Sequence, residues 1–96
     1  MYKPLPDSLT IKESKIHGLG LFAVEDISKE TVLGMSHFYW GTELQRTPLG
    51  AFYNHSNDPN CIKRQTDSRV WLSALRDIKA GEEITVWYTF YEVDDE

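Results

Sequence analysis

Residues 54–61 read Asn-His-Ser-Asn-Asp-Pro-Asn-Cys, and the two residues before them, Phe52 and Tyr53, are aromatic. Asn, Ser and Asp side chains form hydrogen bonds with nearby backbone groups, so this polar segment fits a well-capped turn. It also fits a rigid loop that presents backbone and amide groups to a heteroaromatic ligand. A nucleophilic pair of Cys61 and His55 would need a third group to orient the histidine, and the sequence identifies none. Covalent catalysis is therefore the weakest of the three interpretations.

Two further segments are richer in special residues than packing requires. In the first, Gly18-Leu19-Gly20 stands just before a predicted strand, where glycine permits a positive φ and a close backbone approach to a ligand. Alone, this pair fits an ordinary turn better than a cofactor loop. It lacks the third glycine and the following helix of a dinucleotide-binding loop, which excludes that class. In the second segment, residues 81–91, Gly-Glu-Glu-Ile-Thr leads into a run of aromatic residues that, taken singly, fit core packing.

In this order, the three segments resemble the SET-domain protein lysine methyltransferases. The matching motifs are Gly-x-Gly near the start, Asn-His-Ser followed by Pro-Asn-Cys, and Gly-Glu-Glu-Ile-Thr leading to Tyr88. The resemblance extends from about Leu9 to Tyr91. It implies a mostly β SET-domain fold of several small twisted sheets, in which the C-terminal segment threads beneath a loop to form a pseudoknot. That arrangement would bring Asn54 and His55 next to Tyr88.

The local pattern is also that of a β-rich domain, because short β-branched and aromatic runs alternate with polar and glycine turns. No segment keeps a helical apolar period for three turns, although residues 42–46 could form one short helical turn. Residues 65–68, Gln-Thr-Asp-Ser, read as a hairpin turn. The expected strands are residues 9–11, 20–23, 31–33, 61–63, 69–74 and 84–88.

An internal echo relates two parts of the chain. Residues 23–27 and 74–78 both read Ala-x-x-Asp-Ile, and each is followed by a Glu and then a β-branched residue. We expect both to be strand–turn–strand units in which Asp26 and Asp77 cap their turns. Two copies are too few for a solenoid, which needs at least three.

Length and charge limit the classes of protein that the chain can belong to. With 96 residues, 41% of them hydrophobic, it fits one domain, expected over residues 1–96 with a core at about 9–91 and an acidic tail at 92–96. The net charge is −5, which argues against nucleic acid and anionic membranes as partners and favours neutral or basic ones. One cysteine and three histidines without paired spacing predict no metal site. The lack of a signal peptide and of a long apolar run predicts an intracellular protein.

The resemblance implies a cofactor, an acceptor and a set of site residues. S-adenosylmethionine (S-adenosyl-L-methionine) would donate the methyl group, and the acceptor would be a lysine of a basic protein such as a histone. Tyr88 would be the catalytic residue, and Val86 and Phe90 would line the substrate channel. Val86 stands where an aromatic often limits the number of methyl groups, so di- or trimethylation is expected. The cofactor-binding residues would be His17, Gly18, Leu19, Gly20, Asn54, His55, Tyr88 and Tyr91.

The chain also departs from the family pattern. Asn57 stands where many relatives carry a zinc-binding cysteine, Trp87 stands where many carry Asp, and residues 33–50 are short for a substrate-binding insert. These features predict a minimal, stand-alone SET domain of the viral or bacterial type. Its small groove and the acidic residues 80–96, which hold six carboxylates and no basic side chain, would equally suit a small polyamine as acceptor. A catalytically silent SET-fold binding module is the alternative from another class, and a homodimer could complete the groove.

Overall fold

A computed structural model describes residues 5–87, which form eight strands and one short helix. Tyr88, Phe90, Tyr91 and the acidic tail at 92–96 lie outside the described residues. The elements are β1 (Leu9–Glu13), β2 (Leu19–Ala23), β3 (Val32–Trp40), β4 (Glu43–Arg46), α1 (Pro48–Phe52), β5 (Asn54–His55), β6 (Cys61–Thr66), β7 (Arg69–Ala74) and β8 (Thr85–Val86).

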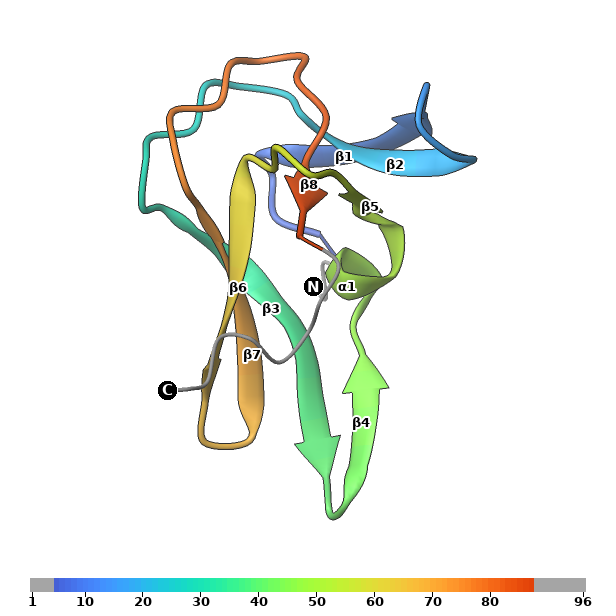
Figure 1. Ribbon diagram of the computed structural model, residues 1–96, viewed down its shortest axis with the longest axis vertical. Helices are drawn as coiled ribbons and strands as arrows, with labels where there is room; N and C mark the ends of the chain where they lie inside the picture. Colours follow the sequence, from blue (N-terminus) through green and yellow to red (C-terminus); the bar gives the residue numbers. More distant parts are fainter. Residues whose placement is uncertain (1–4, 88–96) are drawn as a thin grey trace.

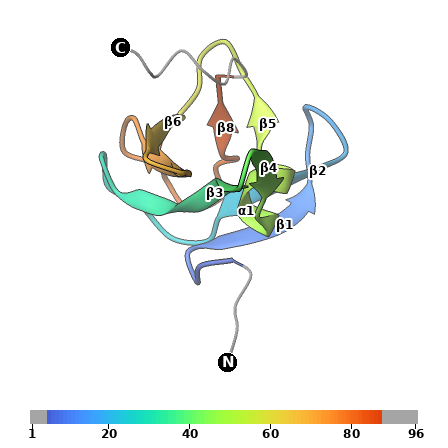
Figure 2. The same ribbon diagram turned by 90° about the horizontal axis from the view of Figure 1, so that it is seen from below.

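The strands form two sheets. The antiparallel pair β1–β2 is one, and the other has six strands in the order β4-β3-β7-β6-β8-β5. Figure 1 shows the β1–β2 pair running horizontally near the top of the view, whereas the long strands β3, β6 and β7 run steeply below it, and Figure 2 shows that the larger sheet is curled rather than flat. The prediction of a mostly β fold made of small twisted sheets is therefore confirmed.

Alternation along the strands builds the core. In β7, Val70, Leu72 and Ala74 are almost fully buried, while Arg69 is exposed. Residues two apart point to the same face of a strand, and on this face Leu72 and Ala74 belong to the core cluster. Burial of each large aliphatic side chain contributes about 1.5–3 kcal/mol. The core cluster comprises Leu9, Leu21, Ala23, Ile27, Leu33, Leu49, Cys61, Leu72, Ala74, Ile78, Ile84 and Val86.

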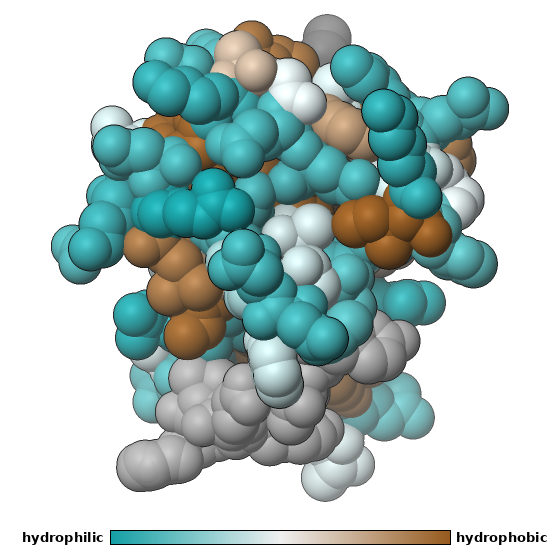
Figure 3. Space-filling model, turned by 45° about the horizontal axis from the view of Figure 1, so that its top comes forward, coloured by the Kyte–Doolittle hydropathy of each residue, from teal (hydrophilic) through white to brown (hydrophobic). Residues whose placement is uncertain are grey.

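The outer surface lacks a comparable apolar area on the face that Figure 3 presents. Hydrophilic side chains cover most of that face, and apolar ones form small, separate patches. Trp40, at the end of β3, is 75% exposed, the highest value among the exposed large hydrophobic residues of the described chain. Among residues 5–87, no helix is long and apolar enough to cross a bilayer.

The helical turn expected at residues 42–46 is wrong, because residues Glu43–Arg46 form strand β4. Gly41 adopts a φ of 66°, which lets the chain reverse directly after Trp40. The reversal pairs β4 with β3 in an antiparallel register that runs from Trp40↔Glu43 to His37↔Arg46. The strand expected at residues 31–33 therefore continues to Trp40, and the hairpin expected at residues 65–68 turns more tightly, at Asp67-Ser68.

The two segments of the internal echo, residues 23–27 and 74–78, contact each other in the structure, but their aspartates do not cap the turns that we expected. Asp26 Oδ1 accepts a hydrogen bond of 2.9 Å from the backbone N–H of Ala80. Asp77 Oδ1 accepts one of 2.8 Å from the backbone N–H of Lys29. Each aspartate therefore caps the turn of the other unit and not its own, which the sequence of one unit cannot reveal.

The predicted threading of the C-terminal segment is present as far as the structure describes it. β8 lies between β5 and β6 and runs parallel to both, with His55 and Cys61 each paired to Val86. The connection 56–60 passes from one side of β8 to the other. Within it, Asn60 is 2% exposed and fixes the incoming segment: its Nδ2 donates to the Glu83 carbonyl at 2.8 Å, and its Oδ1 accepts from the Thr85 N–H at 2.9 Å.

Candidate functional site

A polar network joins the loop between β1 and β2 to strand β5. The two carboxylate oxygens of Glu83 lie 2.9 and 2.8 Å from Ser14 Oγ, and one of them accepts a 2.8 Å hydrogen bond from Asn54 Nδ2. Ser14 Oγ in turn accepts hydrogen bonds from the backbone N–H groups of Ile16 and His17 at 2.9 and 3.3 Å. Residues distant in sequence thus hold the loop in one conformation.

The two glycines of this region serve different purposes. Gly18 has a φ of 49°, which side-chain-bearing residues rarely adopt. Gly20 has an ordinary φ, but a Cβ there would fall on the Glu83 carboxylate and lie 3.1 Å from Asn54 Nδ2. The close approach that Gly20 permits is therefore to the polar network of the chain itself. The backbone carbonyls of His17 and Leu19 complete this contact, at 3.2 and 3.4 Å from Asn54 Nδ2.

A cavity of about 550 Å³ lies beside this network. It brings together three of the predicted cofactor-binding residues, His17, Asn54 and His55, which come from a loop and from β5. Gly18, Leu19 and Gly20 belong to the adjoining loop and strand. The complete lining is Ile16, His17, His37, Leu44, Arg46, Gly50, Ala51, Tyr53, Asn54, His55 and Lys63.

The charged side chains that line this cavity are cations. Arg46 reaches it from β4 and Lys63 from β6, and the described lining includes no carboxylate. Lys63 is only 4% exposed, and its Nζ lies 5.7 Å from the centre of the Tyr53 ring. Burial, followed by the charges of Lys63 and Arg46, lowers the pKa of His37 from 6.5 to about 4. His37 is therefore neutral at pH 7, and the charged residues of the described lining are Arg46 and Lys63.

His55 has partners on both sides. Its Nε2 lies 3.2 Å from Asn57 Oδ1, and its ring meets the edge of Trp87 at 5.8 Å between centroids and 63° between planes. Trp87, for which the sequence indicated no role, is thus a neighbour of a predicted cofactor-binding residue. Trp87 is also the last residue that the structure describes.

Cys61 is not a nucleophile. Its side chain is fully buried, and burial raises the pKa of the thiol to about 12. A thiol with this pKa is protonated at neutral pH and lacks the thiolate that a nucleophilic role requires. Cys61 instead packs in the core cluster, as does Val86, which is 1% exposed and is not among the residues that line the cavity.

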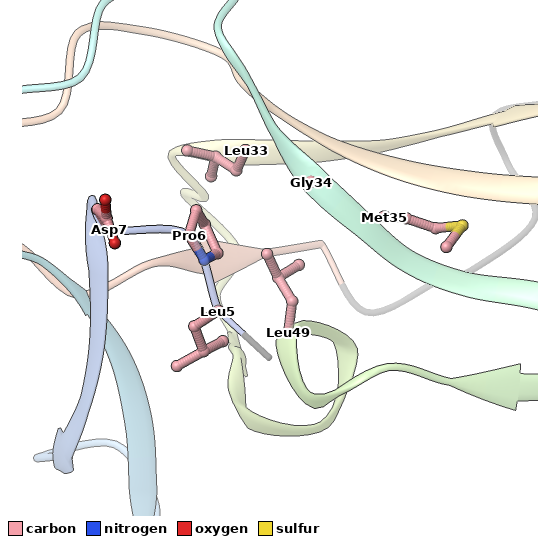
Figure 4. Close-up of a pocket in the computed structure, with 7 residues that line it drawn as sticks. All are labelled: Leu5, Pro6, Asp7, Leu33, Gly34, Met35 and Leu49. Carbon is pink, nitrogen blue, oxygen red and sulfur yellow. The ribbon is translucent and has the colours of Figure 1, made fainter. Parts of the chain in front are cut away.

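A second cavity is lined mainly by apolar side chains. Figure 4 shows Leu5, Leu33 and Leu49 around it, contributed by the segment before β1, by β3 and by α1. Its volume is about 450 Å³, and Asp7 is the charged residue in its lining. It lacks the convergent polar groups of a binding site, so the 550 Å³ cavity is the candidate site.

Sequence reasoning missed several residues of the site. Glu83 was part of a recognised motif but received no role, and nothing near Ser14 indicated a partner 69 residues away. Arg46 and Lys63 received no role, and their strands were unpredicted or only partly predicted. Their meeting depends on the order of strands in the sheet, which local patterns do not contain.

Comparison with known proteins agrees with the fold. A sequence model of the SET domain matches residues 35–89. An Eremothecium gossypii protein named histone-lysine N-methyltransferase, H3 lysine-4 specific, is 33% identical in an alignment of 124 positions that covers 92% of this chain and 13% of that protein. The Schizosaccharomyces pombe histone-lysine N-methyltransferase set9 is 47% identical over 38 residues, covering 40% of this chain and 9% of that protein. The chain therefore spans about an eighth or less of the length of these curated relatives.

Solved structures show the same fold. A candidate histone methyltransferase of Plasmodium falciparum superposes with a TM-score of 0.74 at 22% identity, covering 92% of this chain and 98% of that one. Polycomb Repressive Complex 2 of Chaetomium thermophilum, solved with S-adenosylmethionine, gives 0.71 at 21% identity over 84% of this chain and 15% of that one. Because the SET-domain model matches more than half of its residues, the chain belongs to the SET-domain family.

Proposed function

We propose that this chain transfers the methyl group of S-adenosylmethionine to the side-chain amine of a lysine in a basic protein such as a histone. The observation that carries the proposal is the 550 Å³ cavity, at which His17, Asn54 and His55 converge in a chain of the SET-domain family. The names of the curated relatives, histone-lysine N-methyltransferases, support the same class of acceptor.

The residues of the cavity fit S-adenosylmethionine. Its volume lies within the roughly 300–1,000 Å³ of small-molecule sites. Ile16 and Leu44 offer apolar surface to an adenine ring, and His55 offers a ring nitrogen to the polar atoms of the nucleoside. Arg46 supplies the planar cation that a carboxylate such as that of the methionine portion prefers. When bound, S-adenosylmethionine supplies a methyl group activated by its attachment to a sulfonium.

The contribution of the protein is mainly to position the acceptor and to keep it neutral. A free lysine has a pKa near 10.4, so neutralising it near pH 7.4 costs about 4 kcal/mol at 1.36 kcal/mol per pK unit. The positive charges of Arg46 and Lys63 disfavour a further ammonium in the cavity and so lower that cost. Tyr88, which follows Trp87 in sequence, would orient the amine through its hydroxyl, with Tyr91 at the cofactor.

Two further residues have proposed roles at the acceptor. Phe90 would line the channel for the lysine side chain, and the small Val86 in place of an aromatic would leave room for a second and third methyl group. The acidic segment at residues 92–96 would attract a basic peptide. Mass spectrometry after exhaustive turnover tests the pocket size, since a product that stops at one methyl group would contradict it.

A polyamine is the less favoured acceptor. A polyamine keeps several positive charges when one amine is neutral, and the cations Arg46 and Lys63 repel them within the cavity. A lysine of a protein brings a single amine to the site. The small groove that first suggested a polyamine suits a short peptide segment equally.

The experiment that tests this function is methyl transfer from labelled S-adenosylmethionine to histones, with spermidine and a neutral protein as competing acceptors. We expect label on histone lysines, suppressed little by spermidine. Label on spermidine alone would replace the protein acceptor, and calorimetry that detects no binding of S-adenosylmethionine would favour a silent binding module.

The proposal includes an assembly and a location. Strand β4 is an edge of the larger sheet, and Leu44 on it and the neighbouring Trp40 are exposed apolar side chains, so a homodimer could form across this edge. Sedimentation at micromolar concentration tests the dimer, and a monomer would contradict it. A histone acceptor also implies an intracellular location.

A further inference from the structure

Lys63 differs from the other lysines that the structure describes. Lys12, Lys15, Lys29 and Lys79 are exposed, whereas Lys63 is 4% exposed. It is also the one lysine in the described lining of the cavity that would receive S-adenosylmethionine. The protein therefore carries, inside its candidate donor site, a side chain of the same chemical class as the proposed acceptor.

The position of Lys63 is fixed by the sheet. It lies on β6, between β7 and β8 in the strand order, and it pairs directly with Leu72. Cys61, two residues earlier and on the same face of the strand, pairs with Val86. Val86 is in turn two residues before Tyr88, the proposed catalytic residue. The strand that carries Lys63 is thus the direct neighbour of the strand that leads to the catalytic position.

We propose that Lys63 is itself a methyl acceptor, so that the chain methylates its own Nζ. This inference rests on the proposed function, because it uses the same donor and the same site. In the reaction, the lone pair of the neutral Nζ forms a bond to the methyl carbon while the bond from that carbon to sulfur breaks. The bonding electrons remain on sulfur, which yields the thioether S-adenosylhomocysteine, and one proton leaves Nζ for water. No oxidant or further reactant is required.

The surroundings of Lys63 hold its amine inside the site before and after the reaction. The side chain is almost fully buried, in the same cavity lining as Arg46. The ring of Tyr53, 5.7 Å from Nζ, attracts ammonium and methylammonium groups alike through its face. The neutral imidazole of His37 in the same lining adds no charge that would oppose either form.

An acceptor that is part of the protein reacts without an encounter step. A group held in the site replaces a bimolecular reaction by a unimolecular one, which is a large advantage when the geometry is right. Self-methylation of Lys63 should therefore follow first-order kinetics, with a rate constant that does not change when the protein is diluted. A saturating basic protein substrate should slow it, because both amines compete for one donor.

The test incubates the full chain with labelled S-adenosylmethionine, with and without histone, and maps the modified residues by peptide mass spectrometry. We expect one or more methyl groups on Lys63 of the wild-type protein and none on the exposed Lys29. The rate per molecule should stay constant on dilution. Lys63→Arg, which keeps the charge, and Lys63→Met, which removes it, should both lose the self-label, and Lys29→Arg should keep it.

The outcomes separate this inference from the proposed function. Labelled histone together with unmodified Lys63 in the wild-type protein would overturn self-methylation and leave the proposed function intact. A Lys63 label whose rate falls on dilution would show transfer between chains and overturn the internal reaction. Absence of label on histone and on Lys63 alike would refute both. The decisive readout is the map of the wild-type protein, so it does not depend on the folding of a variant.

Discussion

Replacing Glu83 by Gln should loosen the loop that forms one wall of the site. The carboxylate accepts hydrogen bonds from two donors, Ser14 Oγ and Asn54 Nδ2, each at 2.8 Å. Both bonds end on the same carboxylate oxygen, so a glutamine can keep both with its single acceptor oxygen but loses the negative charge that strengthens them. A hydrogen bond to a charged group contributes about 1.5–3 kcal/mol and a neutral one about 0.5–1.5 kcal/mol. Weakening both bonds from charged to neutral should cost about 2–3 kcal/mol in total.

Two measurements separate the loss of folding stability from the loss of cofactor binding. Urea unfolding gives the loss of global stability, and calorimetry gives the affinity for S-adenosylmethionine. Because Ser14 holds the backbone N–H groups of Ile16 and His17, we expect part of this free energy to be lost from cofactor binding. Each 1.4 kcal/mol lost from the binding free energy weakens the affinity about tenfold. We therefore expect the affinity of Glu83→Gln to fall by about tenfold or more.

The adjacent Glu82 is a matched control. Its carboxylate bonds to the Lys79 N–H at 2.7 Å and to Arg76 at 3.5 Å, and both of these contacts are exposed. Exposed ion pairs contribute about 0–1 kcal/mol, so Glu82→Gln should change stability little and leave the affinity unchanged. Equal effects of the two substitutions on cofactor affinity would refute the role assigned to Glu83.

Three more predictions concern acid stability, the threaded strand and catalysis. His37 has a pKa of about 4 in the folded chain against 6.5 when unfolded, so the unfolded chain binds the proton first as the pH falls. The free energy of unfolding should therefore drop by up to about 3 kcal/mol between about pH 6.5 and 4. In urea unfolding across that range, His37→Gln should lack this part of the pH dependence. A variant with the same pH profile as the wild-type protein would contradict the prediction. Asn60→Ala should cost about 2–4 kcal/mol, because it leaves two buried backbone groups at β8 unpaired, whereas the exposed Asn57→Ala should cost far less in the same unfolding assay. Tyr88→Phe should reduce turnover by about tenfold or more through loss of the orienting hydroxyl, measured as initial rates at saturating cofactor, and full activity would remove Tyr88 from the mechanism.

The sequence predicted those parts of the molecule whose pattern is local. The β-branched and aromatic residues in 69–74 predicted β7, and two residues of the predicted loop 54–61, Asn54 and His55, line the candidate site. Strand β4 was missed because Glu43–Arg46 is largely polar and becomes a strand only by pairing with β3 across the turn at Gly41. Intrinsic β-propensity does not predict a strand whose conformation depends on pairing with its partner strand.

The site was predictable in part for the same reason. His17, Asn54 and His55 were identified through short motifs, and the structure brings them to one cavity. The cationic side of that cavity was not foreseen, since Arg46 and Lys63 come from strands that meet only through the order of the folded sheet. Charge along the chain indicated an acidic protein, whereas the described part of the site is basic.

The mutual capping of the two echo units also has a consequence for how the chain folds. Ile27 and Ile78 exchange backbone hydrogen bonds of 2.7 and 2.8 Å across 51 residues, at the centre of the same relation. Neither turn is complete until the other has been synthesised and has come alongside, so a growing chain gains little from its first unit alone. Pairings at such sequence separation require closure of a long loop before they give stability, which makes folding slow and cooperative. We therefore expect the two units to pair late in folding and to complete the domain together.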